Sequence, residues 1–304
     1  MDFSVLVLGS GAATPKKDRH CASQVVNING LRMLMDCGEA TQHMIRATHQ
    51  KMQSFGNIFI SHLHGDHIFG LPGLLSSIHL CGRTEVVRIV SPKGLKEAMD
   101  ALFRVSDTQP LFPIEYVELE GDAPVEVLRN NKCVVTAFPL HHSVPCYGYR
   151  FEENFPLLNI RRTTIDRYPS LTPGEIASIK QGNDYVNSDG NLVPNAELTH
   201  PRPIPKRYAY CCDTVYSESI LPFIQDVDLL CVESTFADEF ASVAAEKLHC
   251  TASQAALLAK KANAKKLLLT HFSARYKDIT PLIEESTAVF PNTIAAEDGL
   301  RIEI

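Results

Sequence analysis

The sequence of 304 residues contains no apolar run that approaches the ~20 residues of a membrane-spanning helix. Its first nine residues include no basic leader and no small-residue cleavage pattern, so we expect a first β-strand there and no secretory signal. Hydrophobic residues make up 45% and charged residues 21% of the chain, a mixture typical of a globular protein with a sizeable core.

The nine cysteines lack the spacing of a disulfide framework. Their number is odd, there is no Cys-x-x-Cys pair, and Cys211 and Cys212 are too close in sequence to bridge without strain. Cys133, Cys211 and Cys231 lie in apolar segments, where a free cysteine behaves as a small hydrophobic residue. The pattern predicts free thiols and a reduced, cytoplasmic protein.

The chain also lacks an excess of positive charge. Its formal net charge of −6 argues against general affinity for nucleic acid, although an RNA enzyme can gather basic groups locally. Any single basic cluster is more often a solvated face than a binding site. The clusters are Lys16-Lys17-Asp18-Arg19, Arg161-Arg162 with Arg167, Arg202 with Lys206-Arg207, and Lys260-Lys261 with Lys265-Lys266.

Strand-like and helical segments alternate through most of the chain, which predicts an α/β fold of sheets covered by helices in a single domain, 1–304. The expected strands include Ser4–Leu8, Leu31–Met35, Asn57–Ser61, Val86–Val90, Lys132–Phe138, Tyr208–Cys212, Leu229–Val232 and Lys266–Thr270. The expected helices include Ala40–Ala47, Leu74–Leu80, Lys93–Phe103, Glu218–Ile224, Thr251–Ala262 and Thr280–Val289, with Thr251 as an N-cap.

Residues 152–205 interrupt this alternation. The stretch is rich in Pro, Asn and Asp, and its extended ends, Glu152–Asn159 and Pro201–Pro205, bracket a possible helix at Pro173–Lys180. A loop-rich segment of this length inside a compact domain usually has a function. We interpret it as an inserted flexible arm and not as a second domain.

The densest group of metal-binding side chains is Ser61-His62-Leu63-His64-Gly65-Asp66-His67, directly after the apolar strand Asn57–Ile60. Zinc accepts both imidazole nitrogen and carboxylate oxygen. His62 and His64, two residues apart, can face one cation. Asp66 and His67, beyond Gly65, can face a second. Four polar residues on a solvent-exposed loop are the alternative, but this spacing at the end of a strand rarely arises by chance.

Three further candidates follow other expected strands. They are His142, with His141 as a rival, Asp213 after Cys211-Cys212, and His271 after Leu267–Thr270. Functional groups in α/β sheets gather beyond the carboxyl ends of strands, so these residues can complete a two-cation site.

His62-x-His64-x-Asp66-His67 resembles the signature of the metallo-β-lactamase superfamily. The resemblance implies a four-layer αββα sandwich with two metal ions at one edge, between the sheets. It also implies that His62, His64 and His142 hold the first zinc, that Asp66, His67 and His271 hold the second, and that Asp213 bridges the two.

Several blocks along nearly the whole chain resemble ribonuclease Z more specifically. These are His64–Leu74, Asp36-Cys37-Gly38-Glu39-Ala40-Thr41-Gln42, His142–Arg150, Cys212-Asp213-Thr214, His249-Cys250-Thr251 and His271-Phe272-Ser273-Ala274-Arg275-Tyr276. Four positions depart from the family pattern: Ala40 and Cys212 replace glycines, His20 replaces Asn in the Pro15–His20 loop linked with sensing of the CCA end, and Val232 replaces the His before Glu233.

The resemblance implies an endoribonuclease with two Zn²⁺ per subunit that cleaves precursor tRNA on the 3′ side of the tRNA body. It would leave a 3′-hydroxyl on the tRNA and a 5′-phosphate on the trailer. Asp66 is then the proton acceptor, and His249, assisted by Glu233, is the acid that protonates the leaving oxygen. The alternative for His249 is a residue near a helix N-cap with no catalytic part.

The family is typically homodimeric, and the arm lies where ribonuclease Z carries its tRNA-binding arm. From Arg150 to Arg207 we count eight basic and seven acidic residues, so position and length, and not charge, favour that role.

Other interpretations remain open. A hydrolase of the same fold that acts on a small phosphodiester or ester would need neither the arm nor the Pro15–His20 loop, and a non-catalytic RNA-binding relative would not need every ligand. Manganese or iron could also enter a mixed His/carboxylate site.

Gly9–Thr14 follows the first strand but lacks the third glycine of a dinucleotide-binding loop, so we expect no nucleotide cofactor. Asp36 is expected to support a zinc-bound histidine from behind.

Overall fold

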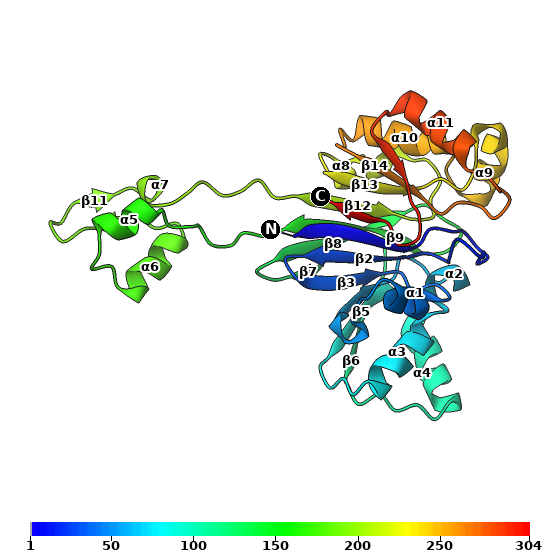
Figure 1. The fold of residues 1–304 in the computed structure, drawn as a ribbon, viewed down its shortest axis with the longest axis horizontal. Helices are drawn as coiled ribbons and strands as arrows, with labels where there is room; N and C mark the ends of the chain where they lie inside the picture. The colour runs from blue at the N-terminus through cyan, green and yellow to red at the C-terminus, as the bar shows by residue number, and fades with distance from the viewer. Residues whose placement is uncertain (1) are drawn as a thin grey trace.

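Two seven-stranded sheets stack on each other, helices cover both outer faces, and a long projection leaves one end of the stack (Figure 1). This computed structural model describes residues 2–304. The order of layers is helices, sheet, sheet, helices, which confirms the predicted α/β four-layer sandwich.

The first sheet alternates its side chains between two cores. In β1, Phe3, Val5 and Val7 face the core between the sheets, whereas Leu6 and Leu8 face the outer helices. This period of two is the natural geometry of a strand whose two faces are both covered. From one edge to the other the sheet consists of β16 (Arg301–Glu303), β1 (Phe3–Gly9), β2 (Ser23–Ile28), β3 (Leu31–Met35), β4 (Asn57–Phe59), β5 (Val87–Pro92) and β6 (Ile114–Leu119).

The second sheet is parallel in the half that follows the projection and antiparallel in the half that precedes it. Strands β12 to β15 run parallel, and β7, β8, β9 and β12 pair antiparallel. In order the sheet consists of β15 (Thr293–Ala295), β14 (Leu267–Thr270), β13 (Leu229–Glu233), β12 (Arg207–Cys211), β9 (Cys146–Glu153), β8 (Cys133–Leu140) and β7 (Val125–Arg129).

Helices form the two outer layers. Over the first sheet lie α1 (Thr41–Ala47), η1 (Met52–Ser54), α2 (Gly65–Ile68), α3 (Leu71–Leu80) and α4 (Leu95–Val105). With the second sheet lie η2 (Glu218–Ile220), α8 (Leu221–Ile224), η3 (Asp238–Phe240), α9 (Ala241–Lys247), α10 (Ala252–Lys261) and α11 (Thr280–Val289). The predicted N-cap Thr251 forms a capping box with Gln254 at the start of α10. Within residues 2–304, no helix combines the length and apolarity that crossing a bilayer requires.

The projection is more ordered than the sequence predicts. It leaves the sandwich after β9 and returns at β12, and between these strands it contains α5 (Arg162–Arg167), α6 (Pro173–Lys180), β10 (Tyr185–Val186), β11 (Leu192–Val193) and α7 (Asn195–Leu198). Ile179, Tyr185, Val193 and Leu198 form a small core of its own. Elements of two to eight residues show too few turns for a hydrophobic period, which is why only α6 was predicted. We call residues 152–205 the arm.

The other differences concern short segments. The sequence predicts a loop at Gly65–Ile68, which forms the helix α2. The predicted strands do not include β2, β6, β7, β9, β15 and β16 of the sandwich. β2 is buried along its whole length, so its sequence lacks the alternation that marks a half-exposed strand.

Candidate metal centre

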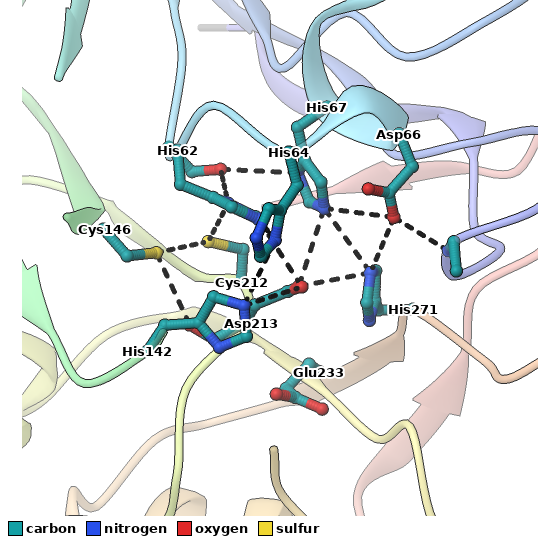
Figure 2. A network of polar contacts seen from close by, with 12 residues as sticks. His62, His64, Asp66, His67, His142, Cys146, Cys212, Asp213, Glu233 and His271 are labelled. Atoms are coloured by element: carbon teal, nitrogen blue, oxygen red, sulfur yellow. Dashed lines mark hydrogen bonds and ion pairs between the residues drawn. The ribbon is translucent and has the colours of Figure 1, made fainter. Parts of the chain in front are cut away.

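The predicted ligands all lie beyond the carboxyl ends of strands, at one edge of the sandwich where the two sheets meet. His62 to His67 follow β4 of the first sheet, and His142, Asp213 and His271 follow β8, β12 and β14 of the second. Figure 2 shows these side chains turned toward one another. The structure therefore brings together all seven residues that the sequence and its family resemblance singled out.

One set of ligand atoms surrounds what we call the first position. His62 Nε2 lies 3.0 Å from His64 Nδ1, and His142 Nε2 lies 3.3 Å from the same atom. Asp213 Oδ2 completes the set at 3.6 Å from His62 Nε2 and 3.7 Å from His142 Nε2. Four ligands at about 2.0–2.2 Å from a tetrahedral cation are separated from one another by about 3.3–3.6 Å, so this spacing fits one cation.

A second set surrounds the second position. His271 Nε2 lies 3.4 Å from His67 Nε2, 3.4 Å from Asp66 Oδ2 and 3.2 Å from Asp213 Oδ1. His67 Nε2 lies 3.6 Å from both carboxylate oxygens. Asp213 thus offers one oxygen to each position, the arrangement expected of a bridging carboxylate.

Asp213 supplies a direct test of whether these residues fit cations. Its Oδ1 atom is buried and has no hydrogen-bond partner among the described residues. A buried carboxylate oxygen without a partner is costly, and a bound cation removes that cost. The mixture of imidazole and carboxylate ligands suits zinc and also admits manganese or iron.

The far sides of the histidine rings fix which nitrogen faces the centre. His67 Nδ1 lies 2.8 Å from Asp36 Oδ2, and His142 Nδ1 lies 3.1 Å from the Leu248 carbonyl. His271 Nδ1 lies 2.9 Å from the Thr235 hydroxyl. Because each Nδ1–H has an acceptor, each Nε2 presents its lone pair to the centre, as a metal ligand must.

The electrostatics of the cluster favour bound positive charge. Burial raises the pKa of Asp66 and of Asp213, but the neighbouring histidines outweigh burial and hold both pKa values below the ordinary range. Burial lowers the pKa of His67, yet the Asp36 and Asp213 carboxylates raise it to about 10. His62 differs, because burial and the nearby His67 hold its pKa well below the ordinary value.

Asp36 contacts the far side of the His67 ring, where the sequence predicts a carboxylate that supports a metal ligand. Its buried carboxylate accepts hydrogen bonds from the Ser61 amide at 2.7 Å, the Ser61 hydroxyl at 2.9 Å and the Tyr210 hydroxyl at 2.9 Å, besides its contact with His67. Tyr210 comes from β12 of the opposite sheet, a contact that sequence spacing could not reveal. These donors fix the Asp36 carboxylate in place, and the carboxylate in turn holds His67 in one orientation.

The candidate acid pair is also assembled. His249 Nδ1 lies 2.7 Å from Glu233 Oε1, and Glu233 is fully buried at the end of β13. Burial lowers the pKa of His249, but the Glu233 carboxylate raises it to about 9. Val232, the residue that replaces the family's histidine, is buried in the core, and His249 contacts Glu233 directly.

The structure decides between the two neighbouring histidines at the end of β8. His142 reaches the first position, whereas His141 is exposed and its amide donates to the Thr214 hydroxyl at 3.1 Å. His249 is closer to the centre than expected, since it can bring a ligand atom within 4.8 Å of those of Asp213 and His271. Each position already has four ligand atoms without His249, which separates it from the seven others.

The glycine-containing loop after β1 contacts this centre. The Ala13 amide donates to Asp66 Oδ2 at 2.8 Å, and Ser10 is fixed by Asp298 at 2.8 Å. In the following segment Arg19 donates to Ser10 Oγ at 2.7 Å and lies 4.8 Å over the Phe272 ring. His20, in place of the family's Asn, pairs with Asp298 at 2.8 Å.

A cavity of about 400 Å³ opens over the centre. Ligands, the acid pair and backbone segments line it together: Ala12, Ala13, Thr14, His64, Asp66, His142, Ser143, Asp213, Thr235, Phe236, Lys247, His249, His271, Ser273 and Ala274. Thr235 was not among the predicted residues, although the family resemblance included its segment. The cavity gives a substrate access to both positions at once.

A family model described as "Anti-Pycsar protein Apyc1" matches residues 3–104, about a third of the chain. The chain is 40% identical over 303 residues to "Ribonuclease Z" of Parabacteroides distasonis, which covers 100% of this chain and 99% of that one.

Two solved structures resemble the whole chain. One is the short form of human tRNase Z, with a TM-score of 0.71, 27% identity, and 98% of each chain covered. The other is the metallo-β-lactamase fold protein YhfI from Bacillus subtilis, with a TM-score of 0.71, 20% identity, and 100% of each chain covered. The fold predicted from the metal motif is thereby confirmed.

Proposed function

The chain belongs to the ribonuclease Z family, and from this premise we propose that it cleaves precursor tRNA on the 3′ side of the tRNA body. It is a metal-dependent endoribonuclease. The products are a tRNA with a 3′-hydroxyl and a trailer with a 5′-phosphate. The observation that carries the proposal is the pairing of two four-ligand positions that share Asp213 with an acid pair, His249 and Glu233, on the wall of the same cavity.

We infer two Zn²⁺ per subunit. His62, His64 and His142 would hold the ion at the first position, Asp66, His67 and His271 the ion at the second, with Asp213 between them. When bound, two such cations activate a water at neutral pH and offset the negative charge that builds on the phosphoryl oxygens. The ligand spacing and the unpartnered Asp213 Oδ1 support this set.

Two side chains of the protein would accept and donate the protons of the reaction. Asp66 stays ionised because neighbouring histidines lower its pKa and the Ala13 amide donates to it. Asp66 is therefore available to accept the proton of the attacking water. His249, kept protonated by Glu233, is the donor for the 3′-oxygen of the tRNA body as the P–O bond to the trailer breaks.

The arm is the proposed docking element for the tRNA body. It projects from the sandwich on two extended connections, and its small core keeps its helices together (Figure 1). Three arginines lie on or beside α5: Arg161, Arg162 and Arg167. Residues 152–205 contain five basic and seven acidic residues, so shape and a few local contacts, and not bulk charge, would guide RNA.

We further propose a homodimer in the cytoplasm. The family resemblance supports the dimer, in which one subunit's arm would clasp tRNA bound at the other's centre. All nine cysteines are free in the structure, including Cys146 and Cys212, whose sulfurs lie 3.4 Å apart. Free thiols this close to one another are compatible with a reducing compartment.

The decisive experiment is incubation with a precursor tRNA and mapping of the cut at single-nucleotide resolution. A single cut at the 3′ side of the tRNA body, with a 5′-phosphate on the trailer, is the expected result. Hydrolysis of a small phosphodiester without any cut in precursor tRNA would instead support the alternative hydrolase. A precursor that carries a CCA end belongs in the same assay, because His20 replaces the family's Asn.

A further inference from the structure

The two metal positions differ in the groups that contact the far sides of their histidine ligands. We propose that Thr235 is a positioning residue that connects Glu233 to His271, and that this connection makes the second position bind its cation more tightly than the first. The inference rests on the metal centre of the proposed function but not on tRNA as the substrate.

Thr235 lies at the meeting point of three groups. Its hydroxyl is 2.5 Å from Glu233 Oε2 and 2.9 Å from His271 Nδ1. A carboxylate oxygen accepts, so the single hydroxyl hydrogen points to Glu233, and the hydroxyl oxygen is left to accept from His271 Nδ1–H. The chain of donors runs from imidazole to hydroxyl to carboxylate and turns His271 Nε2 toward the centre.

Both imidazoles of the second position therefore lead to a buried carboxylate. His67 reaches Asp36 directly at 2.8 Å, and His271 reaches Glu233 through Thr235. A carboxylate behind an imidazole orients the ring and makes its free nitrogen a better metal ligand. Glu233 serves two histidines at once, because its other oxygen holds His249.

The first position has less of this backing among the described residues. His142 Nδ1 has only the neutral carbonyl of Leu248, at 3.1 Å. His62 Nδ1 lies 3.1 Å from the Ser61 hydroxyl, which leads at 2.9 Å to Asp36, the carboxylate that already serves His67 directly. The direct ligands differ in the same sense, since the second position adds the Asp66 carboxylate to the shared Asp213. More negative charge close to a divalent cation means tighter binding.

The test isolates the two positions before it perturbs Thr235. His142→Ala leaves the second position intact, and His271→Ala leaves the first. We measure Zn²⁺ affinity in each full-length variant by competition with a chromophoric chelator. We expect the single ion of the His142→Ala protein to be the more tightly bound. The opposite order of affinities would overturn the proposal without any change at Thr235.

Thr235→Val then removes the hydroxyl while keeping the shape of the side chain. In the His142→Ala background it should weaken Zn²⁺ binding by about 10–100-fold, the usual effect of losing a partner behind a ligand. In the His271→Ala background it should have no effect. Thr235→Ser should restore the affinity. Ser234→Ala is the matched control, because this buried neighbour donates only to the Thr270 carbonyl.

These measurements do not depend on RNA cleavage, so failure of the proposed substrate and failure of this inference are distinguishable. If Thr235→Val lowers turnover but leaves Zn²⁺ affinity unchanged in both backgrounds, Thr235 serves only the His249–Glu233 pair and the proposal is wrong. If both backgrounds lose affinity equally, the substitution disturbs the whole centre and the inequality of the two positions is not due to Thr235.

Discussion

Replacement of His249 by Ala should affect poor and good leaving groups very differently. If His249 donates a proton to the departing ribose oxygen, its loss should lower turnover on precursor tRNA by about 10²–10⁴, the usual range for general acid catalysis. An aryl phosphodiester such as bis(p-nitrophenyl) phosphate releases a phenolate that needs little protonation. Its hydrolysis should therefore fall much less in the same variant.

The environment of His249 sets the size of the effect at each pH. At pH 8 a histidine with a pKa of about 9 is about 90% protonated, whereas one with the ordinary value of 6.5 is about 3% protonated, an advantage of about 30-fold. At pH 6 the two would be protonated almost equally. Bound cations lower the pKa of a nearby histidine, so cleavage of precursor tRNA should begin to fall at or somewhat below pH 9, and this decline should be absent for the aryl substrate.

The assay is single-turnover cleavage of both substrates by wild type and His249→Ala across this pH range, with zinc content measured on the same samples. Zinc content should be unchanged, because His249 is not among the seven proposed ligands. Loss of zinc would identify His249 as a ligand and show that one of the seven is misassigned. Equal losses on both substrates with zinc retained would mean that His249 positions substrate, and the general-acid role would be refuted.

Three further predictions concern the ligands and the arm. His62→Ala, His64→Ala or Asp213→Ala should abolish cleavage and lower bound zinc while circular dichroism stays native, because the ligands lie beyond the strand ends; normal activity with wild-type zinc would contradict the assignment. Deletion of Phe155–Thr199, replaced by a short Gly/Ser linker, should raise the KM for precursor tRNA and spare the aryl phosphodiester, whereas equal losses on both would mean that the arm supports the fold. Binding of precursor tRNA should weaken with added salt along a shallow slope in a filter-binding assay, because the basic groups are few and scattered; a steep slope would indicate a larger phosphate-contacting surface than we propose.

The sequence predicted the parts of the centre that depend on local spacing. His62, His64, Asp66 and His67 lie within six residues, so their convergence follows from one strand end and one turn. His142, Asp213 and His271 were placed by family resemblance and by the rule that strand ends meet at one edge.

What the sequence could not predict are contacts between distant segments. Neither the Tyr210 hydroxyl on Asp36 nor the Ala13 amide on Asp66 has a local signature, since each joins residues more than fifty positions apart. The replacement of the family's glycine by Ala40 can be understood from the backbone conformation at this position. Ala40 adopts φ 66°, in the left-handed region, which explains why the family places glycine there.

The position of the metal centre between the two sheets has a consequence for the stability of the protein. Each proposed cation would take ligands from loops of both halves of the sandwich, so a bound ion would act as a removable cross-link between layers that otherwise adhere through apolar packing and a few hydrogen bonds, such as those of Tyr149 and Tyr210. By linkage, free cation at one hundred times its dissociation constant adds about 2.7 kcal/mol to the free energy of unfolding for each filled position. Supply of metal would then govern not only whether the enzyme turns over but also how stable the sandwich is, and a cell short of zinc would contain a protein that is both less active and easier to unfold.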